Sequence, residues 1–191
     1  MNTRIRLGVC GIIAALAVAS CSSGGGGGLI ARVPPPWANA LGPGVTVTGP
    51  GGASAGDGSP GGVMLSVVAD VQSGDYGRIC AVMEPSAQGQ CDSSVTAAST
   101  SALAGSLPTF TNFAVSYTAV DGDQALVGTT GTVCVPNQTP ACYTNTDPAA
   151  ILSSGKSFAA LWTEAVGASA DAYSLTPEVK VNGSWYAYTT P

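Results

Sequence analysis

The chain has 191 residues, of which six are Lys or Arg, eleven are Asp or Glu and none is His, giving a net charge of −5. So few basic residues argue against binding to nucleic acid or to anionic lipid head groups, both of which need clustered Lys and Arg. The absence of His excludes a Ser-His-Asp triad and a His–Asp dyad.

Residues 1–20 have the pattern of a secretory signal peptide. Arg4 and Arg6 form a positive start, and a largely apolar run follows from residue 7 to residue 18. This run is too short to span a membrane, which takes about 20 apolar residues. Without the signal peptide the chain keeps four basic and eleven acidic residues, so the mature net charge is −7.

The segment Val18-Ala19-Ser20-Cys21 resembles the lipobox of bacterial lipoproteins. The resemblance implies that the Cys21 thiol receives a diacylglyceryl group and that Cys21 becomes the first residue after cleavage. The alternative is an ordinary secretory signal cut near Ala19, with Cys21 incidental. Since two acyl chains anchor a protein stably, we expect the protein at the outer face of the cell membrane, held there by its lipid.

Four cysteines lie beyond Cys21, namely Cys80, Cys91, Cys134 and Cys142. They allow three pairings, and the short spacings favour the disulfides Cys80–Cys91 and Cys134–Cys142. A zinc site usually needs closer ligand pairs, such as C-x₂-C, and His. We therefore expect no metal and no cofactor.

Residues 21–59 are expected to form the lipidated N-terminus and a linker, because runs of Gly and Pro cannot sustain a helix or a central strand. Leu29, Ile30 and Trp37 are apolar positions within this linker. They are either incidental or part of a short segment that docks on the domain or on a partner. One folded domain is expected over residues 60–191.

The domain is expected to begin with helices. Ser59 is a suitable N-cap, and apolar residues with helical spacing extend to Val71 before the Ser73-Gly74 stop. A second helix is expected over Tyr76–Glu84, ended by Pro85, and a third around Cys91–Leu103.

From Phe110 the apolar pattern changes to the period of two that is typical of strands. Residues 110–120 and 125–135 are expected to form a hairpin with its turn at Gly122, which places Phe113 and Tyr117 on the same side. A helix over 158–166 is expected next, with one apolar face formed by Phe158, Leu161, Trp162 and Ala165.

A second hairpin is expected around Asn182-Gly183, the strongest turn signal in the chain. In its first strand, apolar residues at odd positions alternate with Ser174, Thr176, Glu178 and Lys180. A two-residue turn places Val179 opposite Tyr186 and Pro177 opposite Tyr188. These tyrosines are therefore expected on the apolar side of the sheet.

The order of helices, long hairpin and closing hairpin resembles the NTF2-like (SnoaL-like) superfamily. The segments S-G-D-Y-G-R-I-C-A-V-M, A-V-D-G-D-Q-A and V-K-V-N-G-S-W-Y resemble small actinobacterial lipoproteins of unassigned role. The resemblance implies an α+β fold in which a strongly curved, mainly antiparallel sheet wraps around a helix as a cone with one open end. In different relatives the cone holds a ligand or a substrate, packs shut or forms a homodimer.

We therefore expect a non-catalytic module that binds an apolar small molecule or a cell-envelope protein. The candidate ligand-binding residues are aromatic: Phe113, Tyr117, Trp162, Tyr173, Tyr186 and Tyr188. The alternative is an enzyme of the ketosteroid isomerase or polyketide cyclase type, with Tyr117, Tyr173 or Tyr186 and an acid such as Asp70 at its site. The two hypotheses differ in one feature, because the enzyme needs a buried carboxyl group with a raised pKa at the floor of the cone. The pair Asp121 and Asp123 suits a hairpin turn better than a calcium site.

Overall fold

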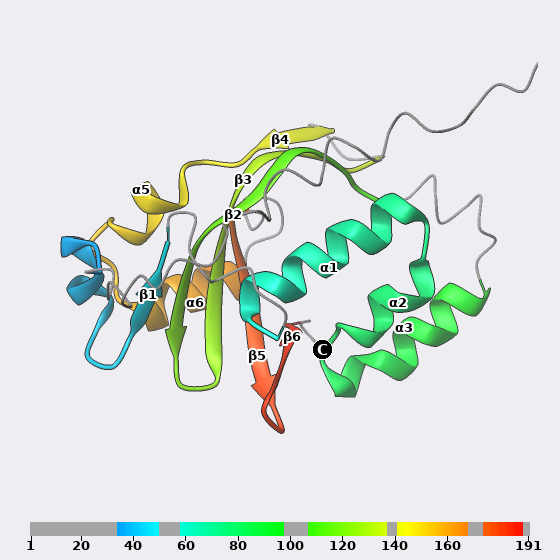
Figure 1. Cartoon of the computed structure of the whole chain (residues 1–191), viewed down its shortest axis with the longest axis horizontal. Coiled ribbons are helices and arrows are strands. Elements are labelled where there is room, and N and C mark those ends of the chain that lie inside the picture. The colour runs from blue at the N-terminus through cyan, green and yellow to red at the C-terminus, as the bar shows by residue number, and fades with distance from the viewer. Residues whose placement is uncertain (1–33, 50–57, 98–106, 137–140, 168–173, 189–191) are drawn as a thin grey trace, which may run out of the picture. The chain divides into compact units, whose positions relative to one another are not determined.

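A six-stranded antiparallel sheet is the central layer of the structure, a computed structural model that describes residues 34–49, 58–97, 107–136, 141–167 and 174–188 (Figure 1). The strand order is β1-β2-β3-β5-β6, and β4 also pairs with β3. The strands are β1 (Thr46–Thr48), β2 (Thr109–Asp121), β3 (Gln124–Cys134), β4 (Cys142–Thr144), β5 (Leu175–Val181) and β6 (Ser184–Ala187). The expected α+β class and both expected hairpins are confirmed.

Helices cover both faces of this sheet (Figure 1). One face carries α1 (Pro60–Ser73), and α2 (Tyr76–Ala81) and α3 (Pro85–Ala97) follow it in the chain. The other face carries the 3-10 helix η2 (Pro36–Leu41), α5 (Pro148–Leu152) and α6 (Phe158–Gly167). We call these two sides the α1 face and the α6 face.

The helix α1 begins and ends as its sequence predicts. The hydroxyl of Ser59 accepts a hydrogen bond of 3.1 Å from the backbone N–H of Gly62, and Gly74 ends the helix with a φ of 75°. Its buried apolar residues are Val63, Met64 and Val68. A single apolar stripe thus docks α1 on the sheet.

The boundaries expected for the next two helices are wrong. The helix α2 already ends at Ala81, and α3 starts at Pro85, six residues before the expected Cys91. Proline ends a helix that precedes it, but it is equally suited to start one, because the first N–H of a helix has no partner within the helix. The expected disulfides are both present: Cys80–Cys91 joins α2 to α3, and Cys134–Cys142 joins β3 to β4.

The expected linker is wrong over residues 34–49, which belong to the folded unit. They form η2 and β1, and β1 pairs with β2. Leu41 and Val47 are buried in the core of the α6 face, and the ring of Trp37 lies edge-on to that of Tyr117 at 5.6 Å. Apolar residues scattered among Gly and Pro therefore complete the core. Leu29 and Ile30 lie outside the described residues.

We expect Leu41→Ala to lower the free energy of unfolding by about 2–5 kcal/mol, the usual range for truncating a buried leucine. Leu41 is only 2% exposed and packs in the α6-face core. Urea denaturation followed by tryptophan fluorescence measures this loss. Val45→Ala, at a half-buried position of the same segment, is the milder control. If Leu41→Ala were as silent as a linker substitution, the packing of η2 would be contradicted.

Two irregularities in β2 change which side chains share a face. The register of β2 against β3 shifts between Thr111 and Ala114 and again between Val115 and Tyr117. Each shift adds a residue to β2, and an odd shift moves the following side chains to the other face. Phe113 consequently packs on the α1 face and Tyr117 on the α6 face. The expectation that these two residues lie on one side is wrong.

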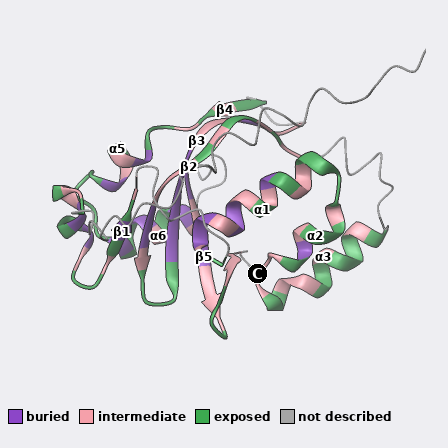
Figure 2. Ribbon diagram, in the orientation of Figure 1, coloured by how far each residue is buried: buried purple, intermediate pink, exposed green. Residues whose placement is uncertain are grey.

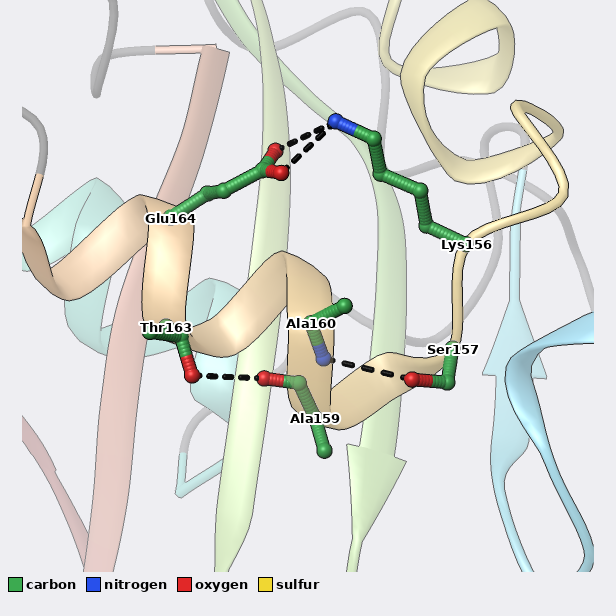
Figure 3. A network of polar contacts seen from close by, with 6 residues as sticks. All are labelled: Lys156, Ser157, Ala159, Ala160, Thr163 and Glu164. Atoms are coloured by element: carbon green, nitrogen blue, oxygen red, sulfur yellow. Dashed lines mark hydrogen bonds and ion pairs between the residues drawn. The ribbon is translucent and has the colours of Figure 1, made fainter.

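The helix α6 confirms the expected apolar face. Phe158, Leu161 and Ala165 are buried, and Trp162 is half-buried (Figure 2). The hydroxyl of Ser157 accepts a 3.3 Å hydrogen bond from the N–H of Ala160 at the helix start (Figure 3). On the outer side, the ammonium group of Lys156 lies 2.7 Å from the carboxylate of Glu164. Sequence pattern and local capping here agree.

The last hairpin also matches its prediction. Val179 lies opposite Tyr186, and Asn182 and Gly183 form the turn with φ angles of 51° and 86°. The N–H of Tyr188 donates to the carbonyl oxygen of Pro177 at 3.1 Å. None of the helices that the structure describes is long and apolar enough to cross a membrane.

Candidate functional site

The most unusual side chain in the described residues is that of Glu178, in the middle of β5. Glu178 lies opposite Ala125 of β3 and Ala187 of β6, and its exposed fraction is 0%. Ala125 and Val127 are two residues apart on β3, so they point to the same face, and Val127 packs against Met64 and Val68 of α1. The Glu178 side chain therefore belongs to the α1 face.

No group in the described residues compensates this carboxyl group. Both of its oxygens are buried and have no hydrogen-bond partner among the residues that the structure describes. Of the basic residues in the described ranges, Arg78 pairs with Asp75, Lys156 pairs with Glu164, and Lys180 lies over the ring of Trp185. Because burial disfavours the charged form, the pKa of Glu178 rises from its ordinary 4.5 to about 9. Glu178 is consequently a neutral carboxylic acid at pH 7.

The hydroxyl oxygen of Thr118 is a second buried polar atom on the α1 face that has no hydrogen-bond partner in the described residues. Thr118 belongs to β2 and is 2% exposed. Thr118 lies opposite Val127, which in turn lies opposite Thr176 of β5. The sheet under α1 thus presents a hydroxyl group and a carboxyl group on either side of an apolar strand.

This arrangement favours binding over structural support. An unpaired buried polar group costs free energy, about 1–3 kcal/mol for a neutral group in proteins. Natural proteins satisfy most such groups, and the exceptions are often functional. A neutral carboxyl group both donates and accepts a hydrogen bond. It can therefore hold a hydroxyl or carbonyl group of a bound molecule.

The aromatic residues expected to bind a ligand do not form one group. Trp162 and Tyr188 lie together with ring centroids 5.6 Å apart, and Tyr117 packs with Trp37, all on the α6 face. Tyr186 is opposite Val179, one residue from Glu178, and so points to the α6 face as well. Phe113 alone lies on the α1 face, in contact with Phe110. Tyr173 lies outside the described residues.

The acid and the described tyrosines considered for an enzyme site do not lie on the same side of the sheet. Asp70 is on α1, whereas Tyr117 and Tyr186 are on the opposite face. Asp121 and Asp123 are exposed at the β2–β3 turn. Within the described ranges, no three Cys, Asp or Glu side chains come together in a way that could hold a metal ion.

The apolar pattern of the sequence does not reveal Glu178, because it predicts a sheet with only one apolar face. A polar residue that alternates with apolar neighbours normally faces solvent. Here α1 covers that polar side, so the alternation correctly gives the face of Glu178 but not its burial. One signal was available: a helix with its own apolar stripe precedes the sheet and has to bury that stripe against a sheet face.

Comparison of the chain with protein-family models, with curated proteins and with solved structures found no match.

Proposed function

We propose that this chain is a lipid-anchored extracytoplasmic protein whose domain binds a small molecule between α1 and the sheet. The observation that carries the proposal is Glu178, a fully buried carboxyl group without a partner in the described residues. Met64, Val68 and Val127 pack together on the same face of the sheet and supply apolar side chains there. Such a combination of an apolar lining with a few polar groups is typical of ligand sites.

We also propose that the domain is an NTF2-like cone. The order of α1 to α3, a long hairpin and a closing hairpin supports this assignment, as does the placement of α1 against the sheet. In some members of that superfamily the cone holds a ligand. A cell-envelope protein on an outer surface is the alternative partner, and the lipid on Cys21 supplies the membrane contact.

An isomerase or cyclase is the second candidate function, and the same residue favours it. A neutral carboxyl group in an apolar site can donate a hydrogen bond to an oxyanion as negative charge develops. Such a reaction also needs a base near the substrate. Of the tyrosines considered for such a site, Tyr117 and Tyr186 lie on the opposite face and Tyr173 lies outside the described residues, so we place the binding function first.

Native mass spectrometry tests the binding function. The mature chain, residues 21–191 with Cys21→Ala to keep it free of detergent, should retain a co-purified small molecule. Glu178→Leu should lose that molecule, because the substitution replaces the two hydrogen-bonding oxygens by an apolar side chain of similar size. Glu164→Leu, at an exposed position of α6, is the control and should retain it. Equal retention by Glu178→Leu and the control would contradict the proposed site.

The anchor is tested separately. We expect Cys21→Ala in the full precursor to leave the domain folded but unprocessed or released into the medium, because the lipid is the proposed membrane contact. Phase partitioning in detergent, followed by immunoblotting, measures the change. Partition of the variant into the detergent phase at the wild-type level would contradict lipidation of Cys21.

A further inference from the structure

Glu178 and Thr118 together limit the chemistry of the bound molecule. Both side chains are more than nine-tenths buried, and neither has a hydrogen-bond partner in the described residues. They lie on the same face of the sheet, on the two strands that flank β3. Two strand spacings of about 4.8 Å lie between them, and they are offset by two residues along the strands, because Thr118 lies opposite Val127 and Glu178 opposite Ala125; their backbones are therefore roughly 12 Å apart. A single small molecule under α1 is long enough to reach both.

The charges around the site exclude most ionic ligands. An anion would lie against the carboxyl group of Glu178. The basic side chains of the described residues are engaged elsewhere, because Arg78 and Lys156 form ion pairs and Lys180 lies over Trp185. A cation would require Glu178 to lose its proton and would bury an ion pair among Met64, Val68 and Val127, where desolvation offsets much of the attraction. Asp70 is the titratable residue of α1, and Lys180 follows Glu178 on the same side of β5. A neutral molecule avoids both costs.

We propose that the ligand of this site is an uncharged molecule with an apolar body and two polar ends, one hydrogen-bonded to the Glu178 carboxyl group and the other to the Thr118 hydroxyl group. This inference rests on the proposed function and adds the chemical class of the ligand and the role of Thr118. A hydroxyl or carbonyl group suits either end, because Glu178 and Thr118 each donate and accept.

Three probes of equal chain length test the charge of the ligand: 1,8-octanediol, 8-amino-1-octanol and 8-hydroxyoctanoate. We expect the diol to bind the mature chain at pH 7 at least tenfold more tightly than either charged probe, measured by NMR chemical-shift titration. A charged probe that binds as tightly as the diol, or a co-purified molecule that carries a charge, would overturn the inference while leaving a binding function intact. If neither the probes nor any co-purified molecule bind, the proposed function itself is wrong.

Variants of Thr118 test the second contact. Thr118→Val removes the hydroxyl and nearly keeps the shape, so it should weaken the diol roughly fivefold, the equivalent of one neutral hydrogen bond. It should leave 1-octanol unchanged, because one hydroxyl can be held by Glu178. Thr118→Ser should keep the wild-type affinity for the diol, and Thr163→Val on α6 is the silent control. An unchanged diol affinity in a folded Thr118→Val variant would show that Thr118 does not contact the ligand.

Discussion

Glu178→Gln is expected to make the folded protein markedly more resistant to unfolding at neutral and alkaline pH. In the wild-type protein burial raises the pKa of Glu178 to about 9, whereas the unfolded chain has the ordinary value of 4.5. Between these values the folded state holds a proton that the unfolded state has released. The free energy of unfolding therefore falls as the pH rises, by about 1.4 kcal/mol per pH unit. The stability due to the protonated carboxyl group is complete below pH 4.5 and lost by about pH 9.

Glutamine has no proton to lose and keeps nearly the same shape, so Glu178→Gln should remove this slope. Urea denaturation at pH 5 and pH 8 measures it. The difference between variant and wild type should change by about 4 kcal/mol over these three pH units, in favour of the variant at pH 8. Glu164→Gln is the matched control, because Glu164 is exposed and forms an ion pair with Lys156. Parallel pH profiles for Glu178→Gln and the wild type would contradict a buried neutral acid.

The same variant separates stability from binding. Glutamine still donates and accepts hydrogen bonds, so Glu178→Gln is expected to retain an uncharged ligand while losing the pH dependence of unfolding. Glu178→Leu is expected to lose the ligand. If Glu178 served only to stabilise the fold, Glu178→Gln and Glu178→Leu would retain the ligand equally well.

Local signals predicted the elements whose residues interact with near neighbours in the chain. Ser59 and Gly74 mark the ends of α1, and Asn182-Gly183 fixes the last hairpin together with the register of Val179 against Tyr186. The short cysteine spacings likewise predict the disulfides, because eight and eleven residues separate the bonded pairs. In each case the deciding contact lies within one turn, hairpin or loop.

The features that escaped prediction depend on contacts between distant segments. Leu41 and Val47 are buried only because the strand β1 joins the edge of β2, about 70 residues away in the chain. The positions of Phe113 and Tyr117 on opposite faces depend on bulges, which shift the register without a clear mark in the apolar pattern. Glu178 has the alternation of a surface residue but is buried, on the face of the sheet against which α1 packs.

Both faces of the sheet are therefore interior, but they differ in composition. Among the described residues, the α6 face buries a continuous group of large apolar side chains, including Leu126, Leu152, Phe158 and Leu161. The α1 face buries fewer large side chains, with Met64, Val68 and Val127 beside the polar Thr118 and Glu178. This division suggests that one face supplies stability and the other is available for binding.

Phe158→Ala tests the stabilising role of the α6 face. Phe158 is 1% exposed and stacks with Trp162 at a centroid distance of 6.2 Å. We expect the substitution to lower the free energy of unfolding by about 3–5 kcal/mol, because it removes a large buried ring and leaves a cavity. Phe158→Leu, which keeps much of the volume, should cost less than about 1.5 kcal/mol. Chemical denaturation monitored by circular dichroism measures both.

Met64→Ala tests whether the α1 face contributes less to stability than the α6 face and is instead available for binding. Met64 is 8% exposed and lies in the smaller group under α1, so its truncation should cost nearer 2 kcal/mol, the lower end of the range for a buried methionine. It should also change the affinity for 1,8-octanediol, whereas Phe158→Leu should not, because the sheet separates Phe158 from Glu178. A loss of stability for Met64→Ala as large as that for Phe158→Ala, with unchanged affinity, would mean that the α1 face is a second structural core and not a binding surface.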